Sequence, residues 1–152
     1  MQLKEIREGD INVRAGILIT DKISVLGCLP TASIQYPNYE RRLDLPKGHL
    51  QEGEDPLDAA IRECWEETNI HFKKWKLKFV GTYSLYSAPF YLYCAVIRVF
   101  PELRLLSCPS TFKKDVLKVP ENSSYELVKI ENISNRFFSE LVPIIESGLS
   151  KR

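Results

Sequence analysis

The strongest constraint on the fold lies in residues 48–70, which read GHLQEGEDPLDAAIRECWEETNI. Asp55 and Pro56 form a strong helix start, because an aspartate caps exposed amides and a proline at the first helical position loses no hydrogen bond. Asn69 marks the helix end, since asparagine tolerates the left-handed conformation that ends many helices. The pattern therefore predicts a helix over residues 56–68.

Two faces of this helix differ in character. Steps of four, three and four place four side chains on one face, which we expect to pack inward. These are Leu57, Ile61, Cys64 and Thr68. A different face carries Glu63, Glu66 and Glu67. Like charges at these spacings destabilise a helix by a few tenths of a kcal/mol per pair, so the crowding has no structural benefit unless a cation lies among the carboxylates.

The residues around the glutamates favour a metal site for phosphate chemistry. Hard divalent cations take oxygen ligands and bind through a few carboxylates together with substrate phosphates. Glu63 and Glu67 are four residues apart, so both carboxylates can reach one ion. Gly48 permits close approach of the backbone to a ligand, and Lys47 and His49 on either side of it are candidates to bind phosphate oxygens. A merely solvated acidic face is the alternative interpretation.

The whole segment resembles the signature of the Nudix hydrolase family, G-x5-E-x7-R-E-U-x-E-E-x-G-U, in which U is aliphatic. The matching residues are Gly48, Glu54, Arg62, Glu63, Cys64, Glu66, Glu67 and Ile70. Asn69 replaces the second glycine, and Cys64 stands at an aliphatic position, where a buried thiol behaves as a small hydrophobe. The resemblance implies an α/β fold, an α/β/α sandwich with a central mixed sheet, and one domain over residues 1–152.

The resemblance also implies a Mg²⁺- or Mn²⁺-dependent pyrophosphohydrolase acting on a nucleoside diphosphate linked to another group. It implies that Glu63 and Glu67 are the primary metal ligands, that Glu66 lies close to them, and that the backbone at Gly48 adds an oxygen. A salt bridge between Glu54 and Arg62 would hold the loop that precedes the helix against the helix itself. The general base that takes the proton of the attacking water would be Glu63 or Glu126, which lies in the strand-like segment SYELVKI.

The substrate class rests on two further resemblances. Residues 45–49, Leu-Pro-Lys-Gly-His, resemble the asymmetric diadenosine tetraphosphate hydrolases, which also tend to carry a tyrosine after the signature. Tyr86 lies sixteen residues past Ile70, and a base stacked on an aromatic ring contributes roughly 1–3 kcal/mol; packing across a strand is the alternative. The expected substrate is therefore a dinucleoside polyphosphate, with Lys47, His49, Arg41 and Tyr86 as substrate-binding residues.

Other functions stay open at this stage. The same chemistry would serve an RNA 5′-end pyrophosphohydrolase or decapping enzyme, or an ADP-sugar pyrophosphatase. A net charge of +1 argues against a strongly basic nucleic-acid surface. A small local basic patch is still compatible with it, and the candidates are Arg41, Arg42 and Lys47. The alternative is that these three residues are ordinary solvated surface charges. A non-catalytic nucleotide-binding module would require the loss of a glutamate, and the three helix glutamates are present.

The remaining sequence predicts strands mixed with helices, as expected of a sheet covered by helices. We predict strands at 13–19, 23–29, 43–45, 77–85, 90–100 and 125–130, turns at 20–22 and 87–89, a polar loop at 30–40, an irregular segment at 106–122 and a closing helix at 137–149. Pro143 is expected to kink or shorten that helix.

The cysteines and the hydropathy pattern predict a cytoplasmic protein. The four cysteines show neither CxxC pairing nor zinc-ligand spacing, and most lie in apolar runs, which fits a reducing compartment. These are Cys28, Cys64, Cys94 and Cys108. The longest apolar run, residues 91–99, is interrupted by Arg98 and is too short to span a bilayer.

Overall fold

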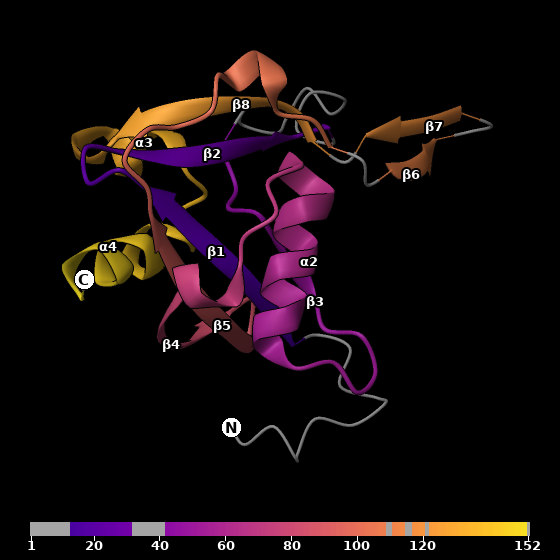
Figure 1. Ribbon diagram of the computed structural model, residues 1–152, viewed down its shortest axis with the longest axis horizontal. Helices are drawn as coiled ribbons and strands as arrows, with labels where there is room; N and C mark the ends of the chain where they lie inside the picture. The colour runs from indigo at the N-terminus through magenta and orange to yellow at the C-terminus, as the bar shows by residue number, and fades with distance from the viewer. Residues whose placement is uncertain (1–12, 32–41, 109–110, 115–116, 121, 152) are drawn as a thin grey trace.

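The computed structural model describes residues 13–31, 42–108, 111–114, 117–120 and 122–151, and in this part of the chain a six-stranded sheet forms the centre (Figure 1). Its order is β4-β5-β1-β2-β8, with β3 paired to β1. Strands β1 and β5 are parallel and the other neighbours are antiparallel, so the sheet is mixed. The strands are β1 (Arg14–Thr20), β2 (Ser24–Pro30), β3 (Lys47–His49), β4 (Lys78–Leu85), β5 (Ala88–Val96) and β8 (Asn122–Lys129).

Helices cover both faces of this sheet, which confirms the predicted α/β/α sandwich. Helix α2 (Pro56–Thr68) lies on one face, and α3 (Ile133–Arg136) and α4 (Val142–Ser150) lie on the other. Short 3₁₀ turns η2 (Lys74–Lys76), η3 (Leu103–Leu105) and η4 (Ile130–Asn132) occur in the connections. None of the helices in the described ranges has the length and apolar character needed to cross a membrane.

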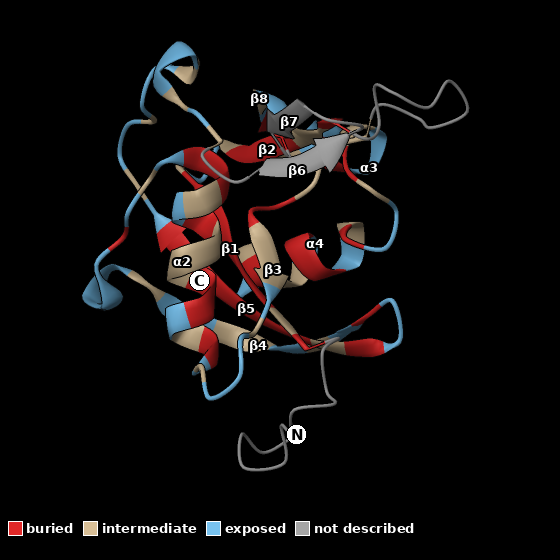
Figure 2. Cartoon of the chain, turned by 90° about the vertical axis from the view of Figure 1, so that its right-hand side faces the viewer, coloured by how far each residue is buried: buried red, intermediate tan, exposed pale blue. Residues whose placement is uncertain are grey.

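The alternation of side chains along β1 and β5 divides the buried residues into two clusters. Ile17 and Tyr93 point to the α2 side, whereas Leu18 and Leu92 point to the α4 side. Successive side chains of a strand point to opposite faces, so strands buried on both faces read as continuous apolar runs. Figure 2 shows the buried residues concentrated along these strands, between the two layers of helices.

Helix α2 begins and ends as predicted, but its buried face is rotated from the expected one. Asp55 accepts a hydrogen bond from the backbone amide of Leu57 at 2.8 Å, and Asn69 adopts φ 66° at the end. Leu57 and Ile61 are only partly buried. The buried residues of the helix are Pro56, Ala59, Ala60, Cys64, Glu67 and Thr68. Two alanines let the helix lie close to the sheet, and Glu67 is consequently turned inward.

The segment before α2 pairs differently from the prediction. Residues 43–45 make only isolated bridges, from Leu43 to Phe137 and from Asp44 to Cys28. The strand is instead β3, which pairs with β1 through Gly48 opposite Ala15. Gly16 permits this pairing, because a Cβ there would lie 2.6 Å from the Cβ of Lys47. Lys47 and His49, the candidates to bind phosphate oxygens, therefore lie on a strand.

Two other connections also differ from the prediction. The β4–β5 turn is centred on Tyr86 and Ser87, both with positive φ, rather than on residues 87–89. Residues 106–122 are not wholly irregular, because β6 (Thr111–Lys114) and β7 (Leu117–Pro120) form a separate antiparallel pair and β8 already begins at Asn122. Most of the predicted polar loop at 30–40 lies outside the described residues.

The C-terminal helix is shorter than predicted. Phe137 is extended and fully buried, and the helix starts only at Val142, with Pro143 in its first turn. A proline is compatible with the first turn because no intrahelical partner exists there for its missing amide hydrogen. Pro143 therefore shortens the helix rather than kinking it.

Candidate functional site

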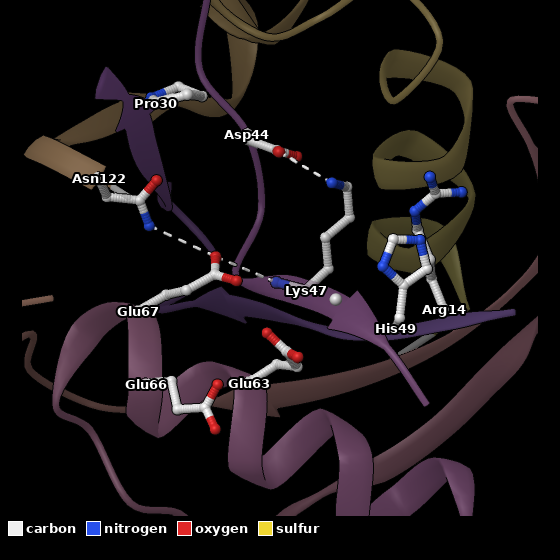
Figure 3. A pocket seen from close by; sticks show the side chains of 10 residues that line it. Arg14, Pro30, Asp44, Lys47, His49, Glu63, Glu66, Glu67 and Asn122 are labelled. Atoms are coloured by element: carbon white, nitrogen blue, oxygen red, sulfur yellow. Dashed lines mark hydrogen bonds and ion pairs between the residues drawn. The ribbon is translucent and has the colours of Figure 1, made fainter. Parts of the chain in front are cut away.

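A cavity of about 460 Å³ lies beside β3, between the glutamate face of α2 and the start of β8 (Figure 3). This volume is in the range of small-molecule sites. Its lining consists of Arg14, Pro30, Asp44, Lys47, Gly48, His49, Glu63, Glu66, Glu67 and Asn122. Figure 3 shows the helix glutamates on one side of β3 and Lys47, His49 and Arg14 on the other. The cavity thus has an acidic half and a half that carries the basic side chains.

Gly48 makes room for the carboxylate of Glu63. A Cβ at Gly48 would overlap the carboxyl carbon and both carboxyl oxygens of Glu63. The glycine is therefore required by the close approach of a side chain from α2 to the backbone of β3, and not by an unusual φ. The arrangement brings the carboxylate of Glu63 against the main chain at Gly48, as the metal-site prediction requires.

Gly48→Ala is expected to lower hydrolytic activity about 100-fold, because displacement of a reacting group by about 1 Å has effects of that size. The fold should be retained, since the colliding atoms are the end of a flexible side chain. Steady-state kinetics and thermal unfolding would measure the two effects. Gly81→Ala is the matched control, because a Cβ there meets Tyr83 only at ordinary contact distances of 3.5 Å. Equal activity of the two variants would contradict the role of Gly48.

Glu67 is the most buried acid in the cavity, with 8% of its surface exposed. Its Oε1 accepts weak hydrogen bonds from the backbone amide of Lys47 and from the side-chain amide of Asn122, both at 3.4 Å. The hydroxyl of Tyr125 donates to the backbone carbonyl of the same residue. Groups from β3 and β8 therefore fix the position of Glu67 beneath the cavity.

Burial disfavours the ionised forms of two carboxyl groups in this half of the cavity. Burial, together with the charges of Asp44 and Glu63, raises the pKa of Glu67 well above its usual range. Burial also raises the pKa of Glu63, although Arg62 partly opposes the shift. Two carboxyl groups this close cannot both ionise easily without a cation. The pair is therefore suited to hold a positive ion.

Arg62 connects the acidic side chains into one network. Its Nε and one terminal nitrogen donate to the two carboxylate oxygens of Glu54, each at 2.9 Å, which confirms the predicted salt bridge. The same terminal nitrogen donates to the backbone carbonyl of His49 at 2.9 Å. The other terminal nitrogen donates to Glu63 at 2.9 Å and to Glu66 at 3.1 Å. One guanidinium thus joins the loop, β3 and the glutamate face.

The donor set fits a hard divalent cation by its chemistry. Carboxylate oxygens are the ligands that Mg²⁺ and Mn²⁺ prefer, and Glu63, Glu66 and Glu67 present them beside the main chain of Gly48. Over the described ranges, no three acidic, histidine or cysteine side chains stand already arranged around a common metal position. Glu66 is held by Arg62 through both of its oxygens, at 3.2 and 3.1 Å.

The metal-free protein is expected to lose stability as the pH rises above the usual pKa range of a glutamate carboxyl group. A carboxyl group whose pKa is raised in the folded state favours folding at low pH, and this contribution is lost as the pH rises through the folded-state pKa. Glu63 and Glu67 are such groups. His49 acts in the opposite direction, because burial, Arg14 and Lys47 lower its pKa.

Chemical denaturation in a chelating buffer would separate these contributions. Glu67→Gln should flatten the fall in unfolding free energy with pH, because it removes one of the two buried acids. Added Mg²⁺ should flatten it in the unaltered protein, because a bound cation favours the ionised form. A slope that is the same in the protein and the variant would contradict the paired-acid interpretation.

Lys47 and His49 both line the cavity, but neither presents a simple phosphate-binding charge. The ammonium of Lys47 bonds to Asp44 at 2.9 Å. Burial alone would lower the pKa of Lys47, but the charge and hydrogen bond of Asp44 outweigh it, so the pKa is raised. Burial, together with the charges of Arg14 and Lys47, lowers the pKa of His49 and so disfavours a charged imidazole. The sequence alone predicted the location of both residues but not these states.

Tyr86 lies next to the cavity rather than in its lining. The guanidinium carbon of Arg14, which does line the cavity, lies 5.6 Å from the centre of the Tyr86 ring. Tyr86 is 51% exposed and has φ 51°. The predicted stacking residue therefore contacts a cationic side chain that sequence reasoning missed.

Glu126, the other residue predicted as a general base, is not among the residues that line the cavity. Glu126 lies opposite Gly27 on β2, and a Cβ at Gly27 would meet Leu43 and Phe137 on the α4 side of the sheet. Arg136 binds both carboxylate oxygens of Glu126, at 2.9 and 2.8 Å, and lowers its pKa. Its neighbour Tyr125 points to the α2 side instead. Adjacent side chains of a strand point to opposite faces, so Glu126 points away from the α2 side on which Tyr125 packs.

The cavity also contains residues that the sequence did not single out. Arg14, Asp44 and Asn122 come from β1, the segment before β3 and β8. Asp44 could have been identified from the sequence, because it lies three residues from the oppositely charged Lys47. No comparable sequence pattern indicated Asn122. Arg41, predicted to bind substrate, lies outside the described residues.

Comparisons with known proteins agree with the sequence and the fold. The sequence profile described as "NUDIX domain" matches residues 12–140. The chain is 51% identical over 41 residues to a probable DHNTP pyrophosphohydrolase of Lactococcus lactis subsp. cremoris, which covers 27% of this chain and 24% of that protein. It is 62% identical over 29 residues to an RNA pyrophosphohydrolase of Bartonella quintana, which covers 19% of this chain and 17% of that protein. The matches thus span a quarter or less of these curated relatives.

A solved structure extends the similarity to nearly the whole fold. The crystal structure of a C. elegans Ap4A hydrolase binary complex aligns with a TM-score of 0.54 and 23% sequence identity, covering 89% of this chain and 93% of that one. At this identity the alignment establishes the fold alone.

Proposed function

The chain belongs to the NUDIX domain family, and we propose that it is a hydrolase that cleaves a phosphoric anhydride bond of a nucleotide with Mg²⁺ or Mn²⁺ bound at Glu63 and Glu67. The observation that carries this proposal is the carboxylate of Glu63 against Gly48, together with the buried carboxyl group of Glu67, in a cavity large enough for a nucleotide. Glu66 and an oxygen of the main chain at Gly48 complete the proposed ligand set.

A bound divalent cation would polarise the phosphoryl oxygens and lower the pKa of a coordinated water. The chain itself supplies the position and the proton acceptor. In the reaction, a water oxygen forms a bond to one phosphorus, the bridging P–O bond breaks, and the departing phosphate carries away the bonding electrons. A carboxylate takes the proton of the water. Because Glu126 does not line the cavity, Glu63 is our candidate for this role.

Hydrogen bonds from neighbouring groups orient the carboxylates that would bind the metal. Arg62 orients Glu63 and Glu66, while the amides of Lys47 and Asn122 hold one oxygen of Glu67. Such outer contacts commonly set the affinity of a metal site. The site therefore depends on β3, α2 and β8 keeping their mutual register.

The preferred substrate class is a dinucleoside polyphosphate such as diadenosine tetraphosphate, cleaved asymmetrically. The resemblance of residues 45–49 to the diadenosine tetraphosphate hydrolases supports this class, and so does the pair formed by Arg14 and Tyr86 at the edge of the cavity. An RNA 5′-end pyrophosphohydrolase is the second candidate, favoured by the 62% identity with such an enzyme over a short segment.

A hydrolysis panel with resolved products tests the proposal. The substrates are diadenosine tetraphosphate, diadenosine triphosphate, ADP-ribose, NADH, a nucleoside triphosphate and 5′-triphosphorylated RNA, each with Mg²⁺ and with Mn²⁺. We expect ATP and AMP from the tetraphosphate at the highest rate. Faster turnover of RNA ends would favour the second candidate, and faster turnover of ADP-ribose would favour an ADP-sugar pyrophosphatase. No turnover with either ion would indicate a nucleotide-binding module instead.

A further inference from the structure

Residues 68–101 carry basic side chains and no acidic ones. This stretch contains five lysine or arginine residues and neither aspartate nor glutamate, although the whole chain has a net charge of only +1. Four of the five lie within six residues, in the run Lys-Lys-Trp-Lys-Leu-Lys at 73–78. A local concentration of one charge attracts a polyanion even where the net charge of the protein is small.

The lysine run lies on the surface at one edge of the sheet. It forms the turn η2 and the first residue of β4, the strand at one end of the strand order (Figure 1). Lys73, Lys74, Lys76 and Lys78 are all exposed. Lys74 contacts Asp58 of α2 at 3.1 Å, but an ion pair between exposed side chains is weak. None of these residues belongs to the lining of the cavity.

Two aromatic rings are exposed among these lysines. Trp75 is 78% exposed and Phe79 is 53% exposed. The ammonium of Lys76 lies 5.6 Å from the centre of the Trp75 ring, so a charge and a ring are presented together. The ring of Phe79 packs beside that of Tyr93, with 5.3 Å between the ring centres. Because Trp75 and Phe79 are four residues apart, their Cα atoms lie within about 14 Å of each other, so one short ligand can contact both.

Rings alternating with lysines suit a single-stranded nucleic acid better than a membrane surface. Single strands bind where basic side chains meet the phosphates and aromatic rings stack on the bases. An element that lies on a membrane instead presents an apolar face along a helix. The turn η2 has three residues, of which Trp75 is the apolar one. The segment thus has groups for phosphates and bases, but little apolar area for lipid.

We infer that residues 73–79 form a binding surface for single-stranded nucleic acid, separate from the catalytic cavity. Lys76 and Lys78 contact backbone phosphates, and Trp75 and Phe79 stack on bases. The inference goes beyond the proposed hydrolysis and does not depend on it, because the surface uses no residue of the proposed metal site.

Fluorescence anisotropy with a labelled single-stranded RNA of about 12 nucleotides, within the usual size of such sites, tests the inference. The RNA carries a 5′-hydroxyl and the buffer contains a chelator, so neither a terminal phosphate nor a bound metal draws it into the cavity. Trp75→Ala should raise the Kd about 5- to 100-fold, the effect of losing one stacked base. Trp75→Phe keeps a ring and should recover most of the affinity. Thermal unfolding should be unchanged in both variants, because the side chain is largely exposed.

Two lysines at opposite edges of the sheet provide a matched test of charge. Lys78 begins β4 and Lys129 ends β8, and both are exposed. Lys78→Ala should reduce the slope of log affinity against log salt concentration by about 0.7, the value for one phosphate contact with a single strand. Lys129→Ala removes the same charge and should leave the slope and the Kd unchanged.

An unaltered protein that does not bind the RNA, full affinity in Trp75→Ala, or equal effects of the two lysine substitutions would overturn the inference. Binding of phosphatidylserine vesicles but not of RNA would assign the surface to a membrane and overturn it as well. A protein that hydrolyses nothing in the substrate panel but binds RNA as expected would refute the proposed function and retain this surface. Hydrolysis without RNA binding would do the reverse.

Discussion

Glu67→Gln is expected to lower kcat/KM on the order of 10³-fold, because weakened metal binding removes several kcal/mol of charge stabilisation in the transition state. The fold should persist, since the amide oxygen of glutamine can still accept the weak hydrogen bonds from Lys47 and Asn122. In the absence of metal, and at a pH above the usual pKa range of glutamate, the variant should be more stable than the unaltered protein, because the pKa of Glu67 is raised by burial.

Kinetics and denaturation of the same preparation would measure both effects. Glu140→Gln is the matched control, because Glu140 is an exposed acid outside the cavity lining. A Glu67→Gln variant that keeps full turnover, or that is less stable without metal, would contradict the assignment of a buried metal-binding acid. The combination of lost activity and gained stability is difficult to obtain from a purely structural residue.

Arg62→Lys is the substitution with the second largest expected effect. Lysine cannot reproduce a planar group that donates to Glu54, His49, Glu63 and Glu66 at once. Activity and metal affinity should each fall about 10- to 100-fold, as for other outer contacts of metal ligands. Unfolding free energy should fall by about 2 kcal/mol, the scale of hydrogen bonds to charged groups.

The two parts of the Arg62 network can be tested separately. Glu54→Gln removes the ion pair between Arg62 and the loop before α2. Burial would raise the pKa of Glu54, but the hydrogen bonds from Arg62 outweigh this effect and the pKa is lowered. It should reproduce part of the loss in stability with a smaller loss of activity. Metal titrations and thermal unfolding of Arg62→Lys, Glu54→Gln and the double variant would show coupling between the two residues. Strict additivity of the effects would argue against a connected network.

The helix and its acidic face were predictable from sequence because their signals are local. Asp55, Pro56 and Asn69 fix the ends of α2 through capping and through backbone preference, and the structure has the same ends. The Glu54–Arg62 pair also followed from a family resemblance over a short segment. These features depend on contacts within some fifteen residues, so no knowledge of the sheet was needed.

The other half of the cavity depends on strand register, which the sequence does not specify locally. Glu126 and Tyr125 are neighbours, yet only Tyr125 faces α2, because alternate side chains of β8 point to opposite sides. Arg14 reaches the cavity because β3 pairs with β1 at His49. The inward turn of Glu67 similarly follows from packing of Ala59 and Ala60 against the sheet, which the apolar periodicity alone did not reveal.

The most direct test of the central claim is a Mn²⁺ titration followed by calorimetry or electron paramagnetic resonance. The account predicts a Mn²⁺ site in the unaltered protein and in Gly81→Ala. It predicts that affinity falls at least about tenfold in Glu63→Gln, Glu67→Gln and Gly48→Ala, because each removes or displaces a proposed ligand. Mn²⁺ affinity that is the same in all five proteins would show that the carboxyl pair at Gly48 does not hold the ion.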